Sequence, residues 1–203
     1  MLNSTKRNEI RQKALEVTKA SEKFQLSHAT YACQTIIRDL VIENYKAKYD
    51  SLSKCIEDRI LHELNYDEQL EERNRLELLI RQKSFYIDVA YIETTSEDAA
   101  RVIKLDNAFV INLSKDLERK IFNKDGSYNY DVIRKIRHLM AHELGHLILH
   151  TDELLNIDGT QGSKLINDEE KEDEASCFGE HLIDLRKERN AKIYHDGGAH
   201  IKF

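Results

Sequence analysis

Two histidines four positions apart, with a glutamate directly after the first, form a pattern that can bind and use a metal ion. They are His142, Glu143 and His146, in the segment His-Glu-Leu-Gly-His. On a helix, residues four positions apart lie one turn apart on the same face, so the two imidazoles can grip one ion. Glu143 then lies within reach of a water activated by that ion. The pattern therefore predicts metal-assisted hydrolysis with Glu143 as the general base.

The apolar residues around this pattern predict the helix that it requires. At about 100° per residue, one face collects the apolar side chains, which are Ile133, Ile136, Met140, Leu144, Leu147 and Ile148. His138, His142 and His146 fall on the opposite face, and Asp131 is a candidate N-cap. A surface histidine stripe without a metal is the alternative interpretation. We favour metal binding, because a histidine needed only for packing would lie on or beside the apolar face.

A catalytic zinc site usually takes three protein ligands and keeps a fourth position for water. An acidic run that opens a later predicted helix offers five candidates for the third ligand: Glu169, Glu170, Glu172, Asp173 and Glu174. Glu172 lies about 60° from Ala175 on the buried side, on a flank whose small residues Ser176 and Gly179 let another helix approach. Glu174 and His181 point the other way. We therefore predict Glu172 as the ligand, although acidic residues also suit a helix N-terminus without any metal.

The remaining elements must position these two helices. Helices are predicted over residues 4–24, 29–48, 50–64 and 66–83, and a short one over 114–122. Alternating apolar residues predict strands over 85–92, 101–105 and 108–113, the last two joined by a tight turn at Asp106–Asn107. A loop over residues 151–167 leads to the acidic helix. The predicted fold class is α+β and helix-rich, with a small antiparallel sheet. The predicted divisions are a helical N-terminal region (1–83), a core (84–190) and a C-terminal tail (191–203).

Composition excludes several classes of protein. The chain has 203 residues, of which 33% are charged, and a net charge of −6, with no proline. It has no apolar run long enough to cross a membrane, no apolar segment of a signal peptide and no basic patch for nucleic acid. Its three cysteines, Cys33, Cys55 and Cys177, are widely spaced, which favours reduced thiols. We expect a cytoplasmic protein that binds neither membranes nor nucleic acid directly.

Three blocks of residues resemble the ImmA/IrrE family of bacterial metallopeptidases. They are Ile111-Asn112, then Arg137-x-x-x-Ala141-His-Glu-Leu-Gly-His-Leu-Ile-Leu-His150, then Glu172-x-x-Ala175-x-x-Phe178-Gly. The resemblance covers residues 85–185. It departs from the family pattern at Ser176, where the family has asparagine, and at 183–185, where the family has an apolar residue and proline.

The resemblance implies a zincin-like core in which His142, His146 and Glu172 hold Zn²⁺ and Glu143 is catalytic. It implies a zinc metalloendopeptidase that cleaves a regulatory protein, typically a DNA-binding repressor in mobile-element or stress control. Two alternatives have little or no turnover. One is a regulatory, partner-binding protein whose zinc site is structural or vestigial and whose helical N-terminal part binds the partner. The other is one half of a toxin–antitoxin pair.

Some roles stay open at this level. An additional donor to the oxyanion could come from His150, His181, His195 or a tyrosine, and we favour an orienting role for His150. Asp173 is a candidate acceptor for a ligand imidazole. Residues 1–83 match no known pattern, and they either bind a partner, present a substrate or wrap the core.

Overall fold

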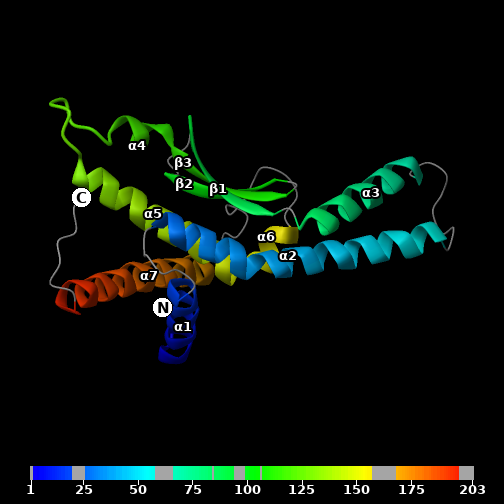
Figure 1. The fold of residues 1–203 in the computed structure, drawn as a ribbon, viewed down its shortest axis with the longest axis horizontal. Coiled ribbons are helices and arrows are strands. Elements are labelled where there is room, and N and C mark those ends of the chain that lie inside the picture. Colours follow the sequence, from blue (N-terminus) through cyan, green and yellow to red (C-terminus); the bar gives the residue numbers. More distant parts are fainter. Residues whose placement is uncertain are drawn as a thin grey trace.

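The computed structural model describes residues 2–19, 26–57, 66–83, 85–93, 99–105, 107–156 and 168–196. The elements in chain order are α1 (Ser4–Lys19), α2 (Leu26–Glu57), α3 (Tyr66–Gln82), β1 (Tyr86–Ile92), β2 (Ala100–Lys104), β3 (Ala108–Ser114), α4 (Lys115–Arg119), α5 (Tyr130–Leu149), α6 (Thr151–Asn156) and α7 (Glu169–Asp196). Figure 1 shows the sheet on one side of α5, with α7 on the other side and α1 beyond α7. The described residues are therefore mostly helical and include a small sheet, as predicted.

Helix α5 carries the histidine pattern through the centre of the fold. Asn129 caps its N-terminus, because its side chain accepts a hydrogen bond from the backbone N–H of Val132. The prediction of Asp131 as the N-cap is wrong by two residues, and Asp131 lies instead in the first turn, where a negative charge suits the helix dipole. The apolar face is buried as predicted at Ile136, Leu144, Leu147 and Ile148.

The sheet is mixed, so the prediction of an antiparallel sheet is wrong in part. Strands β2 and β3 pair antiparallel, as a hairpin should, but β1 pairs parallel with β3, from Tyr86 opposite Ala108 to Ile92 opposite Ser114. The strand order is β1-β3-β2. The most apolar strand, β3, takes the central position and is the most buried of the three. Alternation in sequence predicts a strand but contains no information on its direction.

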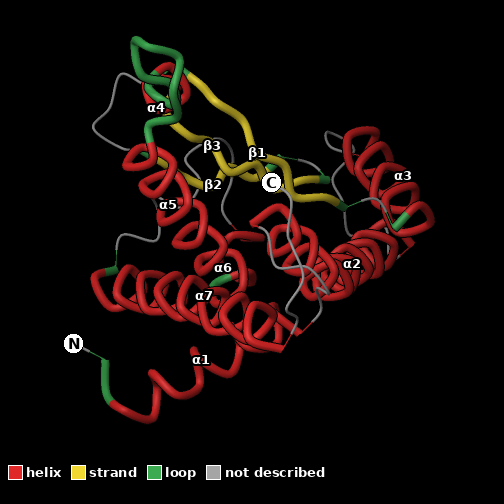
Figure 2. The backbone as a smooth tube through the Cα atoms, turned by 60° about the vertical axis from the view of Figure 1, so that its left-hand side comes forward, coloured by secondary structure: helices red, strands yellow, loops and turns green. Residues whose placement is uncertain are grey.

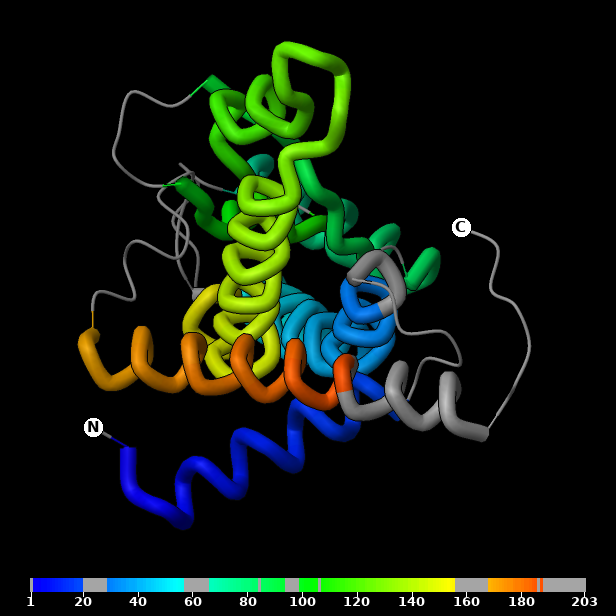
Figure 3. The backbone as a smooth tube through the Cα atoms, turned by 90° about the vertical axis from the view of Figure 1, so that its left-hand side faces the viewer, coloured from blue at the N-terminus to red at the C-terminus, as the bar shows by residue number. Residues whose placement is uncertain are grey.

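Helices α5 and α7 cross at a point that only small residues permit. A Cβ at Gly145 would lie 2.7 Å from the backbone oxygen of Ala175, and a Cβ at Gly179 would lie 3.0 Å from the backbone nitrogen of His142. Figure 3 shows α7, in orange, running across α5, in yellow-green. The predicted close approach on the flank of Ser176 and Gly179 is thus present, and it brings the acidic start of α7 to the histidine face of α5.

The N-terminal helices share the core of the rest of the chain. Buried residues of α1 and α2 belong to the same apolar cluster as Leu144 and Phe178. Helix α1 packs mainly on α7, and α2 packs on α3, α5 and β1. Figure 2 shows α1 beneath α7 and the pair α2–α3 beside the sheet. At least α1 and the adjoining part of α2 therefore wrap the core, which was one of the roles left open for residues 1–83.

The ends of three helices, α2, α6 and α7, differ from those predicted, because polar residues are compatible with a helix as well as with a loop. The two helices predicted over 29–48 and 50–64 are one helix through Glu57, and residues 58–65 lie outside the described part. The predicted loop after His150 begins with α6, and its remainder, 157–167, is not described. Helix α7 continues past residue 191 to Asp196, into the predicted tail, whose residues 197–203 are not described. Asp106, in the predicted turn, also lies outside the described residues.

None of the described helices is long and apolar enough to cross a membrane.

Candidate metal centre

The structure brings the three predicted ligands together. His142 Nε2 lies 3.1 Å from His146 Nε2, both on α5. From α7, the carboxylate of Glu172 places Oε2 3.2 Å from His142 Nε2 and Oε1 3.3 Å from His146 Nε2. These three side chains form a group that could hold a metal ion. The prediction from helical spacing therefore selected, among five acidic residues, the one that faces both histidines.

The distances between these atoms fit a tetrahedral ion. Two ligand atoms that are each about 2.0–2.1 Å from zinc, at a tetrahedral angle, lie about 3.3 Å apart. The two imidazole nitrogens, 3.1 Å apart, are close to this spacing, and each of them has one oxygen of the Glu172 carboxylate at 3.2 or 3.3 Å. A donor set of two imidazoles and one carboxylate is also one that catalytic zinc sites use. The chemistry and the proximity of these residues therefore suit a metal ion, and zinc is one that such a donor set can hold.

Burial keeps both imidazoles in the neutral form that a metal requires. His146 is only 1% exposed, and burial, together with the neighbouring His142 and His150, lowers its pKa to about 3. Burial also lowers the pKa of His142, although the Glu172 carboxylate acts in the opposite direction. Both rings are thus unprotonated near neutral pH and present a lone pair without prior loss of a proton.

Each ligand imidazole has a partner on its other nitrogen. His142 Nδ1 lies 3.2 Å from the hydroxyl of Ser176, and His146 Nδ1 lies 3.3 Å from His150 Nδ1. Such partners fix the ring orientation and the tautomer of a metal-binding histidine. The departure from the family pattern at Ser176 therefore retains a polar group beside His142. It lies one turn after Glu172, on the same face of α7.

The partner of His146 is itself held by a buried carboxylate. His150 Nε2 lies 3.2 Å from Glu174 Oε2, and Glu174 Oε1 lies 2.8 Å from the ammonium group of Lys6 on α1. Burial raises the pKa of Glu174, but hydrogen bonds from Lys6 and His150 outweigh it and hold the pKa below its usual value. The expected orienting role of His150 agrees with this geometry. The candidate acceptor Asp173, in contrast, is exposed.

A cavity of about 340 Å³ lies against the metal group. Its lining includes His142 and Ser176 from the group and its surroundings, together with Lys135, His138, Leu139, Gly179 and Glu180. The wall is thus mixed in polarity and follows α5 toward its N-terminus. A space of this size beside one ligand can admit part of a polypeptide chain.

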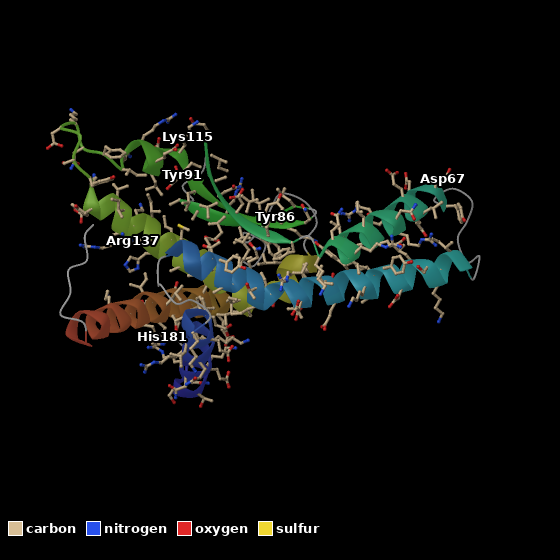
Figure 4. All side chains as sticks on the ribbon, viewed as in Figure 1. Asp67, Tyr86, Tyr91, Lys115, Arg137 and His181 are labelled. Atoms are coloured by element: carbon tan, nitrogen blue, oxygen red, sulfur yellow. The ribbon has the colours of Figure 1, made fainter. Side chains whose placement is uncertain are left out.

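The proposed base Glu143 lies beside the metal group, whereas most of the residues considered as donors to the oxyanion do not line the cavity. Glu143 is 4% exposed, next to His142 on α5. Nε2 of His150 already contacts the carboxylate of Glu174. His181 lies below α7 on the side of α1, whereas Arg137 lies beside α5 (Figure 4). The side chain of His195 is outside the described residues. The cavity lining contains no tyrosine among the described residues but does contain His138.

The roles of three residues at or near the site, Lys6, His138 and Glu174, were not predicted from sequence. Glu174 was assigned to the outer side of its helix, and it does point away from Glu172, but α1 covers that side and buries it. No signal in the sequence connects Lys6 with Glu174, because 168 positions separate them. His138 was placed on the histidine face without a role, and its repeat of the four-residue spacing was the available signal.

Comparison with protein-family models, with curated proteins and with solved structures gives no match to this chain. The resemblance to the ImmA/IrrE family therefore stays a prediction that depends on the three motif blocks. The geometry of the metal group is independent of that resemblance, since it follows from the positions of α5 and α7.

Proposed function

We propose that this protein is a zinc-dependent metalloendopeptidase of the ImmA/IrrE type. The observation that carries the proposal is the triangle of His142, His146 and Glu172, with separations suited to zinc and a carboxylate directly after the first histidine. The cavity beside His142 adds to it, because structural zinc sites are closed by four protein ligands whereas catalytic sites stay open on one side. In the described part of the chain, this group has three ligand-type side chains.

The proposed mechanism assigns separate tasks to the side chains. A bound zinc ion supplies Lewis acidity, which acidifies water and polarises a carbonyl group. Glu143 accepts a proton from the attacking water and delivers it to the leaving amine, as a general base and then a general acid. His138 lines the cavity beside His142, where it can contact a bound peptide. The substrate proposed from the family resemblance is a regulatory protein, such as a DNA-binding repressor in the cytoplasm.

Metal analysis of the purified protein, combined with a cleavage assay on DNA-binding proteins encoded beside its gene, tests the proposal. We expect about one zinc per chain and cleavage that a chelator abolishes. The Glu143→Gln variant should retain the metal and lose cleavage, because Gln cannot carry the proton. His142→Ala should lose both. Normal turnover by Glu143→Gln would refute the role of Glu143.

The second candidate function is a partner-binding protein with little or no turnover. The observation that favours it is the arm formed by α3 and the C-terminal half of α2, which extends away from the sheet and α7 (Figure 1). Leu78 and Tyr66 on this arm are 53% and 45% exposed. Stoichiometric zinc, no cleavage and a stable complex with the product of a neighbouring gene would support this candidate, including its toxin–antitoxin form.

A further inference from the structure

A continuous row of polar contacts connects the metal group to the N-terminal helix. It runs from His146 through His150 on α5 to Glu174 on α7 and ends at Lys6 on α1, with successive separations of 3.3, 3.2 and 2.8 Å. The three inner members are 1%, 5% and 7% exposed, so water competes little for these contacts. The proposed mechanism uses only the first member of this row.

Once His146 binds a metal, only one assignment of the protons on His146 and His150 satisfies every contact in this row. Nε2 of His146 must be the ligand atom, since it faces His142 and Glu172, and the proton of the neutral ring is therefore on Nδ1. That Nδ1–H donates to Nδ1 of His150, whose own proton is then on Nε2. The Nε2–H of His150 donates to Glu174, a carboxylate that accepts only, and Lys6 donates to the second carboxylate oxygen.

Each contact therefore fixes the next. Lys6 holds one oxygen of Glu174, so the other oxygen faces His150. His150 cannot rotate without breaking a buried hydrogen bond, which is costly because the group left behind has no water to replace its partner. Outer partners of this kind set the orientation and basicity of a ligand imidazole.

We infer that Lys6, Glu174 and His150 are positioning residues for the metal ligand His146, and that helix α1 is thereby a working part of the metal centre. The inference rests on the proposed metal site but not on peptidase activity. Asn3 supports the placement of Lys6, because its side-chain oxygen accepts a hydrogen bond from the backbone N–H of Lys6 at 2.9 Å and so caps α1 at this turn.

Metal affinity and the absorption spectrum of the cobalt(II)-substituted protein test the inference. Zinc affinity is measured by competition with a chromophoric chelator for the full chain and its variants. Glu174→Ala should lower zinc affinity roughly 10–100-fold. It should also change the visible bands of bound cobalt, because the His146 ring loses its fixed orientation. Lys6→Met should act in the same direction by a smaller factor, and Lys6→Arg should restore most of the loss.

Two comparisons separate positioning from general stability. Lys13→Met makes the same substitution at an exposed position of α1 and should leave affinity and spectrum unchanged. In the Glu174→Ala background, Lys6→Met should have no further effect, since Lys6 acts only through Glu174. An unfolding curve for each metal-free variant shows whether that variant is folded. If Glu174→Ala does not fold, the Lys6→Met and Lys6→Arg variants alone test the positioning role.

The outcomes distinguish this inference from the proposed function. Failure of the unmodified protein to bind zinc or cobalt would overturn both. Binding by the unmodified protein, with Lys6→Met and Glu174→Ala unchanged in affinity and spectrum, would overturn the positioning role alone. Equal losses in Lys6→Met and Lys13→Met would overturn it as well.

Discussion

The crossing of α5 and α7 makes Gly145 the position where a single methyl group should disturb the metal centre most. In Gly145→Ala the new Cβ would lie 2.7 Å from the backbone oxygen and 2.9 Å from the Cα of Ala175. Both atoms are backbone, so no side-chain rotation relieves the contact. Reaching the 3.0–3.4 Å range of tight but tolerated contacts requires the helices to separate by about 0.3–0.7 Å.

That displacement acts on the ligands directly. Glu172 lies one turn before Ala175 on α7, whereas His142 and His146 remain on α5. Distances in a metal site must stay within about 0.2 Å of their preferred values, so a shift of 0.3–0.7 Å should cost about tenfold or more in zinc affinity. Overpacking costs about 1–3 kcal/mol, and replacing a helical glycine by alanine recovers about 1 kcal/mol. The metal-free protein should therefore lose only about 0–2 kcal/mol of stability.

The assay pairs chelator competition with urea unfolding of the metal-free protein. Gly179→Ala is the matched comparison, since its Cβ would meet His142 N at 3.0 Å and should cause a smaller loss of affinity. A Gly145→Ala protein that binds zinc as tightly as the unmodified protein, with equal or greater stability, would show that the helices do not hold the ligand spacing in the way described.

Three further predictions concern the surroundings of the ligands. Ser176→Ala removes the partner of His142 Nδ1 and should weaken zinc binding by roughly tenfold in chelator competition, with little effect on unfolding. The metal-free protein should lose stability as the pH falls from about 6.5 toward 3, by up to about 1.4 kcal/mol per pH unit. The reason is that His146 takes up a proton in the unfolded chain but not in the folded chain, where it is buried. Urea unfolding at several pH values should show this slope, and a flat profile would contradict the argument from burial. Asn129→Ala should cost about 0.5–2 kcal/mol in thermal or urea unfolding through loss of the hydrogen bond to Val132 N–H, while zinc affinity per folded molecule stays the same.

Helical periodicity was sufficient to predict that His142, His146 and Glu172 lie together, because both helices are regular and small residues mark the flank of α7 that meets α5. The four-residue spacing fixed His142 and His146, and the small residues after Glu172 indicated which flank of the second helix would approach them. The same argument could not find the partner of His150. Glu174 lies on a face that looks solvent-exposed in sequence and is buried only because a helix from the other end of the chain covers it.

The sheet shows a different limit. Alternation and a turn signal predicted three strands and one hairpin correctly, since these depend on neighbours in sequence. The parallel pairing of β1 with β3 is a contact between strands separated by β2, and it depends on which strand is central. The merging of two predicted helices into α2 has a similar cause, because polar residues around Asp50 suit a helix start but also suit the exposed face of a continuous helix.

The position of α1 has a consequence for synthesis of the protein in the cell. Helix α1 is synthesised long before its main packing partner, α7, which begins only at Glu169. At about 5–20 residues per second, roughly 8–30 s pass between the two. During that interval Ile10, Ala14 and Val17 cannot yet be covered by α7, although all three are fully buried in the folded chain. Nascent chains of intermediate length should therefore depend on chaperones more than the finished protein does.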